Sequence, residues 1–358
     1  MRTFLFLSLS LFVAASARVE LHVHLDGAVD SELLADIAAL RNLTVPGTST
    51  TPPSASDLDK LVRSKSSFER FDVINDIIGG SVEAAYAVGV WFAERQGRMN
   101  VTYSELRYDP LRMSRSSYEN STADMNVIVE SLTGGLTNGA KSHGNTVHTI
   151  LCAMRDQPVE NCFQVAELAA SLDGVVGIDL AGDEATYNNT AFVPCFKYAK
   201  EELHLNTTVH SGELGTLEAR RFDIRTAVLD MNVDRIGHGY AAAGDAELMT
   251  LLKDHKVHLE VCPGTALAEK EIDAVKEFLH YDLSFGLSED DPSPYFGGCD
   301  FECIEVVASS CQGRAGLKPS PAARAICTAR RLIGRGGGGM SDADIEKSYQ
   351  DAMNAAFA

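Results

Sequence analysis

Eight short apolar segments, separated by stretches with helical spacing, constrain the fold of this chain more than any other feature. Apolar runs of about four to eight residues bounded by turn residues are typical of buried strands. Strands that alternate with helices favour an α/β fold with a parallel sheet, and eight such units close a TIM (β/α)8 barrel. The predicted strands span residues 19–24, 101–108, 146–152, 175–180, 207–210, 235–238, 257–262 and 283–287.

An open, doubly wound sheet is the alternative architecture. That fold carries a Gly-x-Gly-x-x-Gly turn after its first strand, whereas the residues that follow the first strand predicted here are Leu25-Asp26-Gly27-Ala28. No low-complexity linker interrupts residues 19–290. We therefore predict a single barrel domain over residues 18–358, within which residues 299–340 are poorly defined by any pattern.

The segment 41–80 is longer than a minimal connection between a strand and its helix, and it contains an amphipathic stretch at 68–78. Insertions of this kind commonly form lids. We therefore expect extra helices over the C-terminal mouth of the barrel. Near the end of the chain, Gly336 to Gly339 break the pattern, and Ser341 to Asp344 resemble the capped start of a last helix.

The chain has 358 residues and a formal net charge of -19. An acidic surface repels phosphate backbones and anionic lipid, so neither nucleic acid nor a membrane surface is an expected partner. The apolar run at 3–14 is shorter than the roughly 20 residues that a membrane-spanning helix needs. We expect no membrane span, a small-molecule ligand and a monomer.

The N-terminus indicates secretion. Residues 1–17 have a basic start, an apolar run and the small-residue pattern Ala15-Ser16-Ala17, which is typical of a signal peptide. Cleavage there would leave only Arg18 before the first strand, so a buried N-terminal strand in a cytoplasmic protein is the alternative. Five N-glycosylation sequons favour the secretory pathway, and they begin at Asn42, Asn100, Asn120, Asn188 and Asn206.

The chain has eight cysteines and no Cys-x-x-Cys pair, so a thiolate zinc knuckle is not indicated. Cys299, Cys303 and Cys311 lie close together and could form a disulfide in an oxidising compartment. Cys152 and Cys262 lie in apolar strand-like runs and are expected to be buried thiols.

His22 and His24 are the first candidates for chemistry. Residues two apart on a strand face the same side, and these two lie where the first predicted strand ends. In a barrel, the C-terminal ends of the strands form the active-site mouth. Two imidazoles at this spacing can bind one divalent ion, although His-x-His alone is a weak signal and is often a pair of ordinary hydrogen-bonded histidines.

Similar side chains recur where later strands end. His210 and Glu213 follow the fifth predicted strand, His238 follows the sixth, and Asp290 and Asp291 follow the eighth. Imidazole and carboxylate are ligands that suit zinc, and catalytic zinc keeps an open position where water is activated. The fourth strand supplies no lysine as a bridge between two metals, so we expect one Zn²⁺ per chain at a hydrolytic site.

These segments resemble the adenosine deaminase family of the amidohydrolase superfamily. The likeness covers residues 19–295 in order, and the motifs are specific together rather than singly. Weaker echoes occur at 105–110 and 152–158. The matching segments are Val19-Glu-Leu-His-Val-His-Leu-Asp-Gly27, Gly177-Ile-Asp-Leu-Ala-Gly-Asp-Glu184, Thr208-Val-His-Ser-Gly-Glu213, Gly237-His-Gly-Tyr240 and Asp290-Asp-Pro292.

The resemblance implies a role for each matching residue. Glu213 would be the acid that protonates N1 of the purine, which requires a carboxyl group that keeps its proton at neutral pH. His238 would orient the attacking hydroxide. The implied zinc ligands are His22, His24, His210 and Asp290, and the implied substrate contacts are His24, Asp26, the backbone N–H of Gly182, and Asp291, which would also contact the nucleophile.

The sequence departs from the family pattern at two places. Glu289 stands where the pattern has Thr, and 262–266 reads Cys-Pro-Gly-Thr-Ala in place of Cys-Pro-Trp-Ser-Ser. The missing Trp puts the substrate preference in doubt. The predicted reaction is deamination of adenosine and deoxyadenosine. The alternatives are a deaminase acting on adenine, AMP or N6-methyl-AMP, and a secreted growth-factor-like barrel with little turnover.

Overall fold

Eight parallel strands form one sheet in the computed structural model, which describes residues 18–268, 271, 273–296 and 342–356. The strands follow one another around the sheet in chain order. All eight predicted strands are present, with ends that differ by at most two residues from the prediction. They are β1 (Arg18–His24), β2 (Val101–Tyr108), β5 (Thr146–Met154), β6 (Val175–Ala181), β7 (Asn206–Ser211), β8 (Arg235–His238), β9 (His258–Val261) and β10 (Phe285–Leu287).

The sheet closes on itself where β1 meets the segment after β10. The backbone N–H of His24 donates to the carbonyl of Asp290 at 3.0 Å, and the N–H of Asp290 donates to the carbonyl of His22 at 2.8 Å. Val23 and Asp290 form the parallel bridge between these segments. The predicted TIM barrel is therefore confirmed, and the residues that close it are predicted metal ligands.

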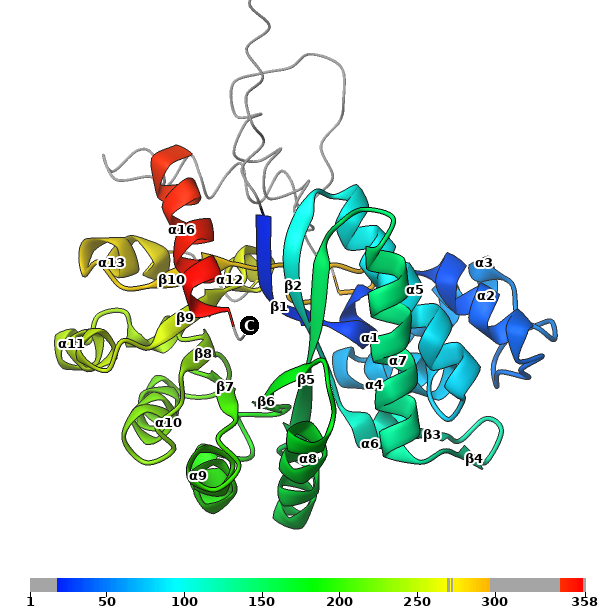
Figure 1. Ribbon diagram of the computed structural model, residues 1–358, viewed down its shortest axis with the longest axis horizontal. Coiled ribbons are helices and arrows are strands. Elements are labelled where there is room, and N and C mark those ends of the chain that lie inside the picture. The colour runs from blue at the N-terminus through cyan, green and yellow to red at the C-terminus, as the bar shows by residue number, and fades with distance from the viewer. Residues whose placement is uncertain (1–17, 269–270, 272, 297–341, 357–358) are drawn as a thin grey trace, which may run out of the picture.

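Helices surround the sheet (Figure 1). Several begin at a side-chain cap: Ser81, Thr216 and Asp245 each accept a hydrogen bond from a backbone N–H in the first turn. The outer helices are α5 (Val82–Arg98), α7 (Met125–Ala140), α8 (Val159–Ser171), α9 (Val193–Glu201), α10 (Leu217–Leu229), α11 (Ala246–Asp254), α12 (Pro263–Ala268) and α13 (Ala274–His280).

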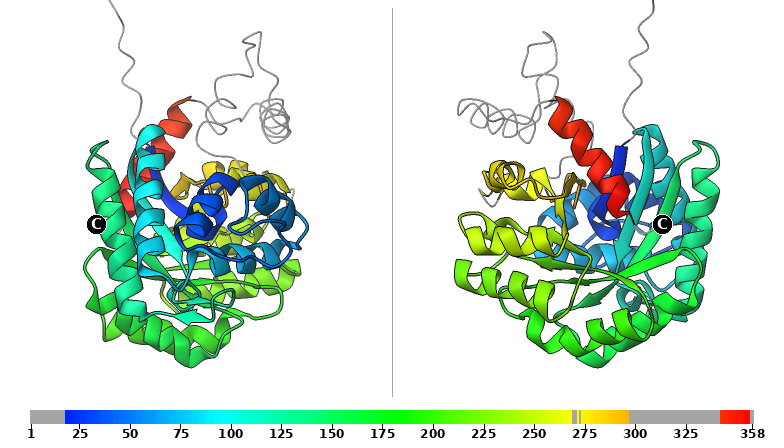
Figure 2. Two further views of the ribbon diagram at one scale, coloured as in Figure 1. Left: turned by 90° about the vertical axis from the view of Figure 1, so that its right-hand side faces the viewer. Right: turned by 60° about the vertical axis from the view of Figure 1, so that its left-hand side comes forward.

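The last helix, α16 (Asp342–Ala355), packs beside β1 and β10 (Figure 2). Its Ala352 forms a small buried cluster with Val19, Leu21 and Tyr103, so the helix covers the end of the barrel opposite the mouth. The predicted start of a last helix is confirmed from Asp342 onward, whereas the whole segment 299–340, with Gly336 to Gly339, lies outside the described residues.

The insertion after β1 forms the extra helices that the sequence predicts. The four-residue α1 (Leu25–Ala28) leads into α2 (Ser31–Leu40), α3 (Ala55–Arg63) and α4 (Ser67–Ile78). Arg70 of α4 donates to the backbone carbonyl of Tyr295 at 2.6 Å, and the rings of Phe71 and Phe296 stack. These contacts hold α4 against the chain just after Asp290 and Asp291, beside the mouth.

Packed against α4, a short helix α6 (Pro110–Met113) and a two-stranded hairpin, β3 (Arg115–Ser116) and β4 (Ser121–Thr122), follow β2. Single 3-10 turns η1 (Asn189–Phe192) and η2 (Tyr240–Ala242) follow β6 and β8. Among the described residues, no single helix is long and apolar enough to span a membrane. Only α4 and α5 taken together pass that test, and a bend of 114° separates them.

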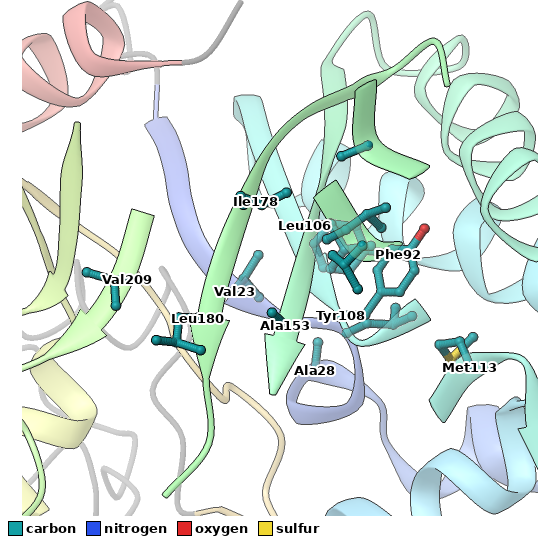
Figure 3. Close-up of a cluster of buried hydrophobic side chains, with 14 of the residues drawn as sticks. Val23, Ala28, Phe92, Leu106, Tyr108, Met113, Ala153, Ile178, Leu180 and Val209 are labelled. Carbon is teal, nitrogen blue, oxygen red and sulfur yellow. The ribbon is translucent and has the colours of Figure 1, made fainter. Parts of the chain in front are cut away.

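The barrel strands carry two different faces. One face is apolar and packs under the helices, as Figure 3 shows for Val23, Leu106, Ile178 and Val209 together with Phe92 of α5. Residues at the alternate positions are polar or charged, yet they are just as buried. This second face points into the barrel, and it carries the site.

A disulfide joins Cys162 of α8 to Cys195 of α9, with 6.2 Å between the Cα atoms. The sequence did not predict this pair, because 33 residues separate the two cysteines and only the fold brings the neighbouring helices together. Cys152 and Cys262 are buried free thiols, as expected. Cys299, Cys303 and Cys311 lie outside the described residues.

Candidate metal centre and active site

Four predicted site residues converge at the mouth of the barrel. One donor atom from each of His22, His210, His238 and Asp290 lies within 4.8 Å of the others, and all four residues are buried. His24 joins this group, since its Nε2 lies 3.0 Å from Nε2 of His210 and 3.6 Å from Oδ1 of Asp290. We call these five residues the ligand cluster.

The ligand cluster fits a metal ion. Nε2 of His22 lies 3.3 Å from Oδ1 of Asp290, but it is buried and makes no hydrogen bond within the described part of the chain. A buried imidazole nitrogen without a partner costs free energy, and a cation held by imidazole and carboxylate groups would satisfy it. The four predicted ligands, His22, His24, His210 and Asp290, all belong to the ligand cluster, and the group within 4.8 Å has His238 in place of His24.

Two members of the ligand cluster have strained backbones. His238 has φ of 71° and Asp290 has φ of 66°, in the left-handed region that non-glycine residues seldom occupy. Such strain persists only where the surrounding structure enforces it, and it is common at functional sites. Here it occurs where the chain leaves β8 and β10, so the left-handed turn fixes the direction in which each side chain leaves its strand.

Glycines make room for two site residues. A Cβ atom on Gly237 would lie 2.7 Å from Cε1 of His22, and one on Gly27 would lie 1.7 Å from Oδ1 of Asp291. Both distances are far shorter than any normal contact. The His22 ring and the Asp291 carboxyl group can therefore occupy their places only because the neighbouring residues lack side chains.

Burial and neighbouring charges shift the pKa values of these groups in opposite directions. Burial lowers the pKa of His24 and of His238 well below the usual range, so both imidazoles are neutral, as a metal ligand must be. The pKa of Asp290 is held well below normal, because its close contacts with the imidazoles of His22, His238 and His24 outweigh its burial. Burial and the charge of Asp290 raise the pKa of Asp291 well above normal.

Below the ligand cluster lies a second layer that we call the charged floor: Glu105, Arg107, Asp179, Arg235 and Glu260. Oε2 of Glu260 lies 2.7 Å from Nδ1 of His22, and Oδ2 of Asp179 lies 3.0 Å from Nδ1 of His210. All five residues are almost completely buried. The charged floor therefore orients the rings whose other nitrogens face the ligand cluster.

Sequence reasoning missed most of the charged floor. Asp179 lies inside β6 and contacts His210, so it belongs to the barrel interior and not to a loop at the mouth. Asp183 does hold its loop, because it accepts hydrogen bonds from the backbone and hydroxyl of Thr186. The available signal was a charge inside a predicted buried strand, such as Arg107 or Glu260.

Glu213 lies at the edge of the site, with Oε2 at 3.4 Å from Nε2 of His238. Its loop is held by Glu184, whose carboxylate accepts from the backbone N–H groups of Gly212, Glu213 and Leu214 at 2.6 to 2.9 Å. The Glu213 side chain is 16% exposed, the same as that of His24 and more than the other members of the ligand cluster. It can therefore face a ligand at the mouth while contacting His238.

The predicted substrate contacts lie around the same mouth. Asp26 follows β1 and accepts a hydrogen bond from Asn75 of α4 at 2.7 Å, and burial raises its pKa. Gly182 follows β6 with φ of 100°, which a residue with a side chain would rarely adopt. Oδ1 of Asp291 is buried and lacks a hydrogen-bond partner among the described residues.

The two departures from the family pattern both touch the site. The hydroxyl of Thr265 donates to Oδ2 of Asp290. Glu289 forms an ion pair with Arg95 of α5 at 2.8 Å, and its backbone N–H donates to the buried Glu20 at 3.0 Å. The altered residues thus hold the Asp290 segment from both sides.

The closed barrel and its ligand cluster define a (β/α)8 protein with a candidate metal site at the mouth. The model of the family described as adenosine deaminase matches residues 17–310. The chain belongs to the adenosine deaminase family, whose members are hydrolytic deaminases.

Individual relatives agree with this assignment. Adenosine deaminase from Bos taurus is 31% identical over 299 residues, which cover 77% of this chain and 79% of that protein. The structure of an amidohydrolase from Burkholderia ambifaria with bound zinc has a TM-score of 0.72 at 16% identity and covers 96% of this chain and 86% of that one. Arabidopsis N6-mAMP deaminase has a TM-score of 0.70 at 22% identity, covering 96% and 93%. These two structures support the fold alone.

Proposed function

We propose that this chain is a zinc-dependent adenosine deaminase that converts adenosine to inosine and deoxyadenosine to deoxyinosine, with release of ammonia. The observation that carries the proposal is the position of Glu213 beside His238 at the edge of the ligand cluster. An acid next to a site for activated water is what hydrolysis of a ring amidine needs. The family match supports the same reaction.

The ligand cluster would hold one zinc ion, with His22, His24, His210 and Asp290 as its ligands. A zinc ion supplies Lewis acidity that activates water at neutral pH. Imidazole and carboxylate donors suit zinc, and the neutral state of His24 is consistent with that role. Asp179 and Glu260 hold the rings of His210 and His22 from behind.

The remaining residues act on the purine. Glu213 holds a proton that it delivers to N1, which makes C6 electrophilic. His238 is the member of the ligand cluster that contacts Glu213, and there it orients the attacking water. A buried oxygen of Asp291 lacks a hydrogen-bond partner among the described residues, and its carboxyl group, whose pKa is raised, can donate a proton to N7. The backbone N–H of Gly182 donates to N3. Asp26 contacts the ribose.

A nucleotide substrate is the second candidate, and one observation favours it. A cavity of about 450 Å³ opens at the rim of the mouth, lined by Arg112 and Arg115 as well as by Asp72, Asp76 and Asn75, the partner of Asp26. Arg112 is already paired with Asp72 at 2.9 Å and with Asp156 at 3.1 Å. A neutralised cation attracts phosphate weakly, so we favour the nucleoside.

An ultraviolet assay of the purified full chain tests this proposal. The panel is adenosine, deoxyadenosine, adenine, AMP and N6-methyl-AMP, measured at equal enzyme concentration. We expect the two nucleosides to give the highest kcat/KM. Preference for AMP or N6-methyl-AMP would establish the nucleotide alternative, preference for adenine would establish the base, and no turnover on any of them by zinc-loaded protein would favour a binding barrel.

We also propose that the protein passes through the secretory pathway. The disulfide between Cys162 and Cys195 supports this location, because such bonds persist mainly in oxidising compartments. The sequon asparagines Asn42, Asn100, Asn120, Asn188 and Asn206 are all exposed, as glycan acceptors must be.

Three of these asparagines, Asn42, Asn100 and Asn120, have positive φ. Asparagine is common there for conformational reasons, so the sequons alone are weaker evidence than their number suggests. Blotting of culture medium against cell lysate, with and without a glycosidase, is the test. Secreted protein whose mass falls after treatment is expected, and unglycosylated protein confined to the cytosol would overturn the proposal.

A further inference from the structure

Arg107 connects the two carboxylates that stand behind separate members of the ligand cluster. It lies on β2 inside the barrel and is completely buried. Its Nη1 lies 3.0 Å from Oδ2 of Asp179, and its Nη2 lies 2.8 Å from Oε2 of Glu260. The same Nη2 also donates to the backbone carbonyl of Leu21 at 2.6 Å, in the strand that carries His22.

In each carboxylate, one oxygen contacts both Arg107 and Nδ1 of a histidine ring. Oε2 of Glu260 contacts Arg107 and Nδ1 of His22, and Oδ2 of Asp179 contacts Arg107 and Nδ1 of His210. A movement of the guanidinium therefore shifts the atoms that hold the two rings. His22 is on β1 and His210 is on β7, so the connection crosses the barrel.

The arrangement fixes the tautomers of the two imidazole rings as well as their positions. A carboxylate only accepts hydrogen bonds, so Nδ1 of each imidazole carries a proton, and in the neutral ring that binds a metal, Nε2 then has a free lone pair. Nε2 of His22 has no hydrogen-bond partner among the described residues, and Nε2 of His210 faces Nε2 of His24. Both rings thus present an unprotonated nitrogen to the ligand cluster.

We propose that Arg107 is a positioning residue for the metal centre, which sets the orientation of His22 and His210 together through Glu260 and Asp179. The inference rests on the proposed metal dependence, but it concerns metal affinity rather than substrate. An arginine suits this task because its planar fork can bond two carboxylates at once, whereas a lysine ammonium is a single point charge.

A purely structural role for Arg107 is the competing explanation, because any buried guanidinium neutralises nearby carboxylates. Arg235 provides the matched control. It is equally buried and contacts Glu260 through Nε at 2.7 Å, but its other carboxylate partner is Glu105 and not Asp179. Substitution at Arg235 therefore perturbs the charged floor without breaking the connection to His210.

The test measures zinc affinity of the metal-free full chain by competition with a chromophoric chelator. Arg107→Lys is expected to weaken zinc binding by about 10- to 100-fold. Arg235→Lys should lower the melting temperature about as much as Arg107→Lys does, while its zinc affinity stays within about threefold of wild type. A wild-type affinity in Arg107→Lys, or equal losses in the two variants, would overturn the inference. Failure of the wild-type chain to bind zinc would instead refute the proposed function.

A second measurement applies if Arg107→Lys does not fold. Asp179→Asn and Glu260→Gln are isosteric and can be combined. If Arg107 couples the two rings, the loss of affinity in the double variant is smaller than the product of the two single losses. Independent, multiplicative losses would contradict the coupling. Nitrogen chemical shifts of the labelled imidazoles give a further readout, since both variants should allow the other tautomer of the affected histidine.

Discussion

The ligand cluster and the charged floor occupy the same barrel interior, yet they are organised differently. In the charged floor, opposite charges are matched: Arg107 pairs with Asp179 and Glu260, and Arg235 pairs with Glu105 and Glu260. In the ligand cluster, buried imidazole nitrogens such as Nε2 of His22 and Nδ1 of His238 remain without hydrogen bonds in the described part of the chain.

This difference indicates that the charged floor makes the barrel interior rigid, whereas the ligand cluster provides the groups that bind a ligand. A buried ion pair is expensive to break, because the partner is left as an uncompensated charge. A buried nitrogen without a partner is ready to bind a ligand, at a cost in stability that the rest of the fold must offset. Substitutions in the ligand cluster and its rim should therefore change activity more than stability, and substitutions in the charged floor should do the reverse.

The largest expected effect is on turnover. Glu213→Gln removes the proton donor while keeping the shape of a side chain that is 16% exposed. We expect kcat for adenosine to fall by about 10²- to 10⁴-fold, with metal content and melting temperature close to wild type. Elemental analysis and thermal melts serve as controls. Activity near the wild-type level would show that Glu213 is not the acid.

The next effect is on stability. Arg235→Met leaves Glu105 and Glu260 without one buried counter-charge, which should reduce the free energy of unfolding by about 3–5 kcal/mol. Urea unfolding measures the loss. Arg98→Met is the control, because Arg98 is 55% exposed in its pair with Glu94, and such surface pairs contribute less than about 1 kcal/mol. Equal losses in the two variants would show that burial does not distinguish the charged floor.

Gly237 allows the two layers to be tested at their junction. Gly237→Ala would place Cβ 2.7 Å from Cε1 of His22, so the ring must move away from Glu260. We expect zinc affinity to fall by about tenfold, a loss typical of disturbed outer partners. Gly134→Ala in α7 is the control, since its Cβ would lie 3.9 Å from Cε2 of Tyr86, which is an ordinary van der Waals contact. Unchanged zinc affinity in Gly237→Ala would mean that the His22 position does not govern binding.

Much of this architecture could be predicted from the sequence, for a physical reason. The strands are short, strongly apolar on one face and separated by helices, so their number and order follow from local pattern. His22, His24, His210, His238 and Asp290 all lie at strand ends, and the barrel geometry brings strand ends together. The ligand cluster was therefore predictable once the number of strands was known.

The charged floor and the disulfide were harder to predict from the sequence. Arg107 pairs with Glu260 across the barrel, 153 positions away, and no local pattern reveals which buried charges meet. The Cys162–Cys195 pair depends on how α8 and α9 lie beside each other. Strand ends share one location by topology, whereas the partners of a side chain depend on the register and shear of the closed barrel.

The smallest effect at neutral pH concerns His258, at the opposite end of the barrel interior from the ligand cluster. Burial, together with the charges of Arg235 and Lys347, lowers its pKa to about 3 despite the nearby Glu260. The unfolded chain therefore binds a proton between pH 6.5 and 3 that the folded chain excludes, and stability falls as pH falls through that window.

His258→Gln removes this titration while keeping a polar group near the hydroxyl of Ser284, which lies 2.9 Å from Nδ1 of His258. Relative to wild type, the variant should gain about 2 kcal/mol of stability between pH 7 and pH 5. Urea unfolding of both proteins at the two pH values gives the difference, in which all other titrating groups cancel. A variant that parallels the wild-type chain over this range would show that His258 is protonated in the folded barrel, and that the charged floor tolerates another cation beside Arg235.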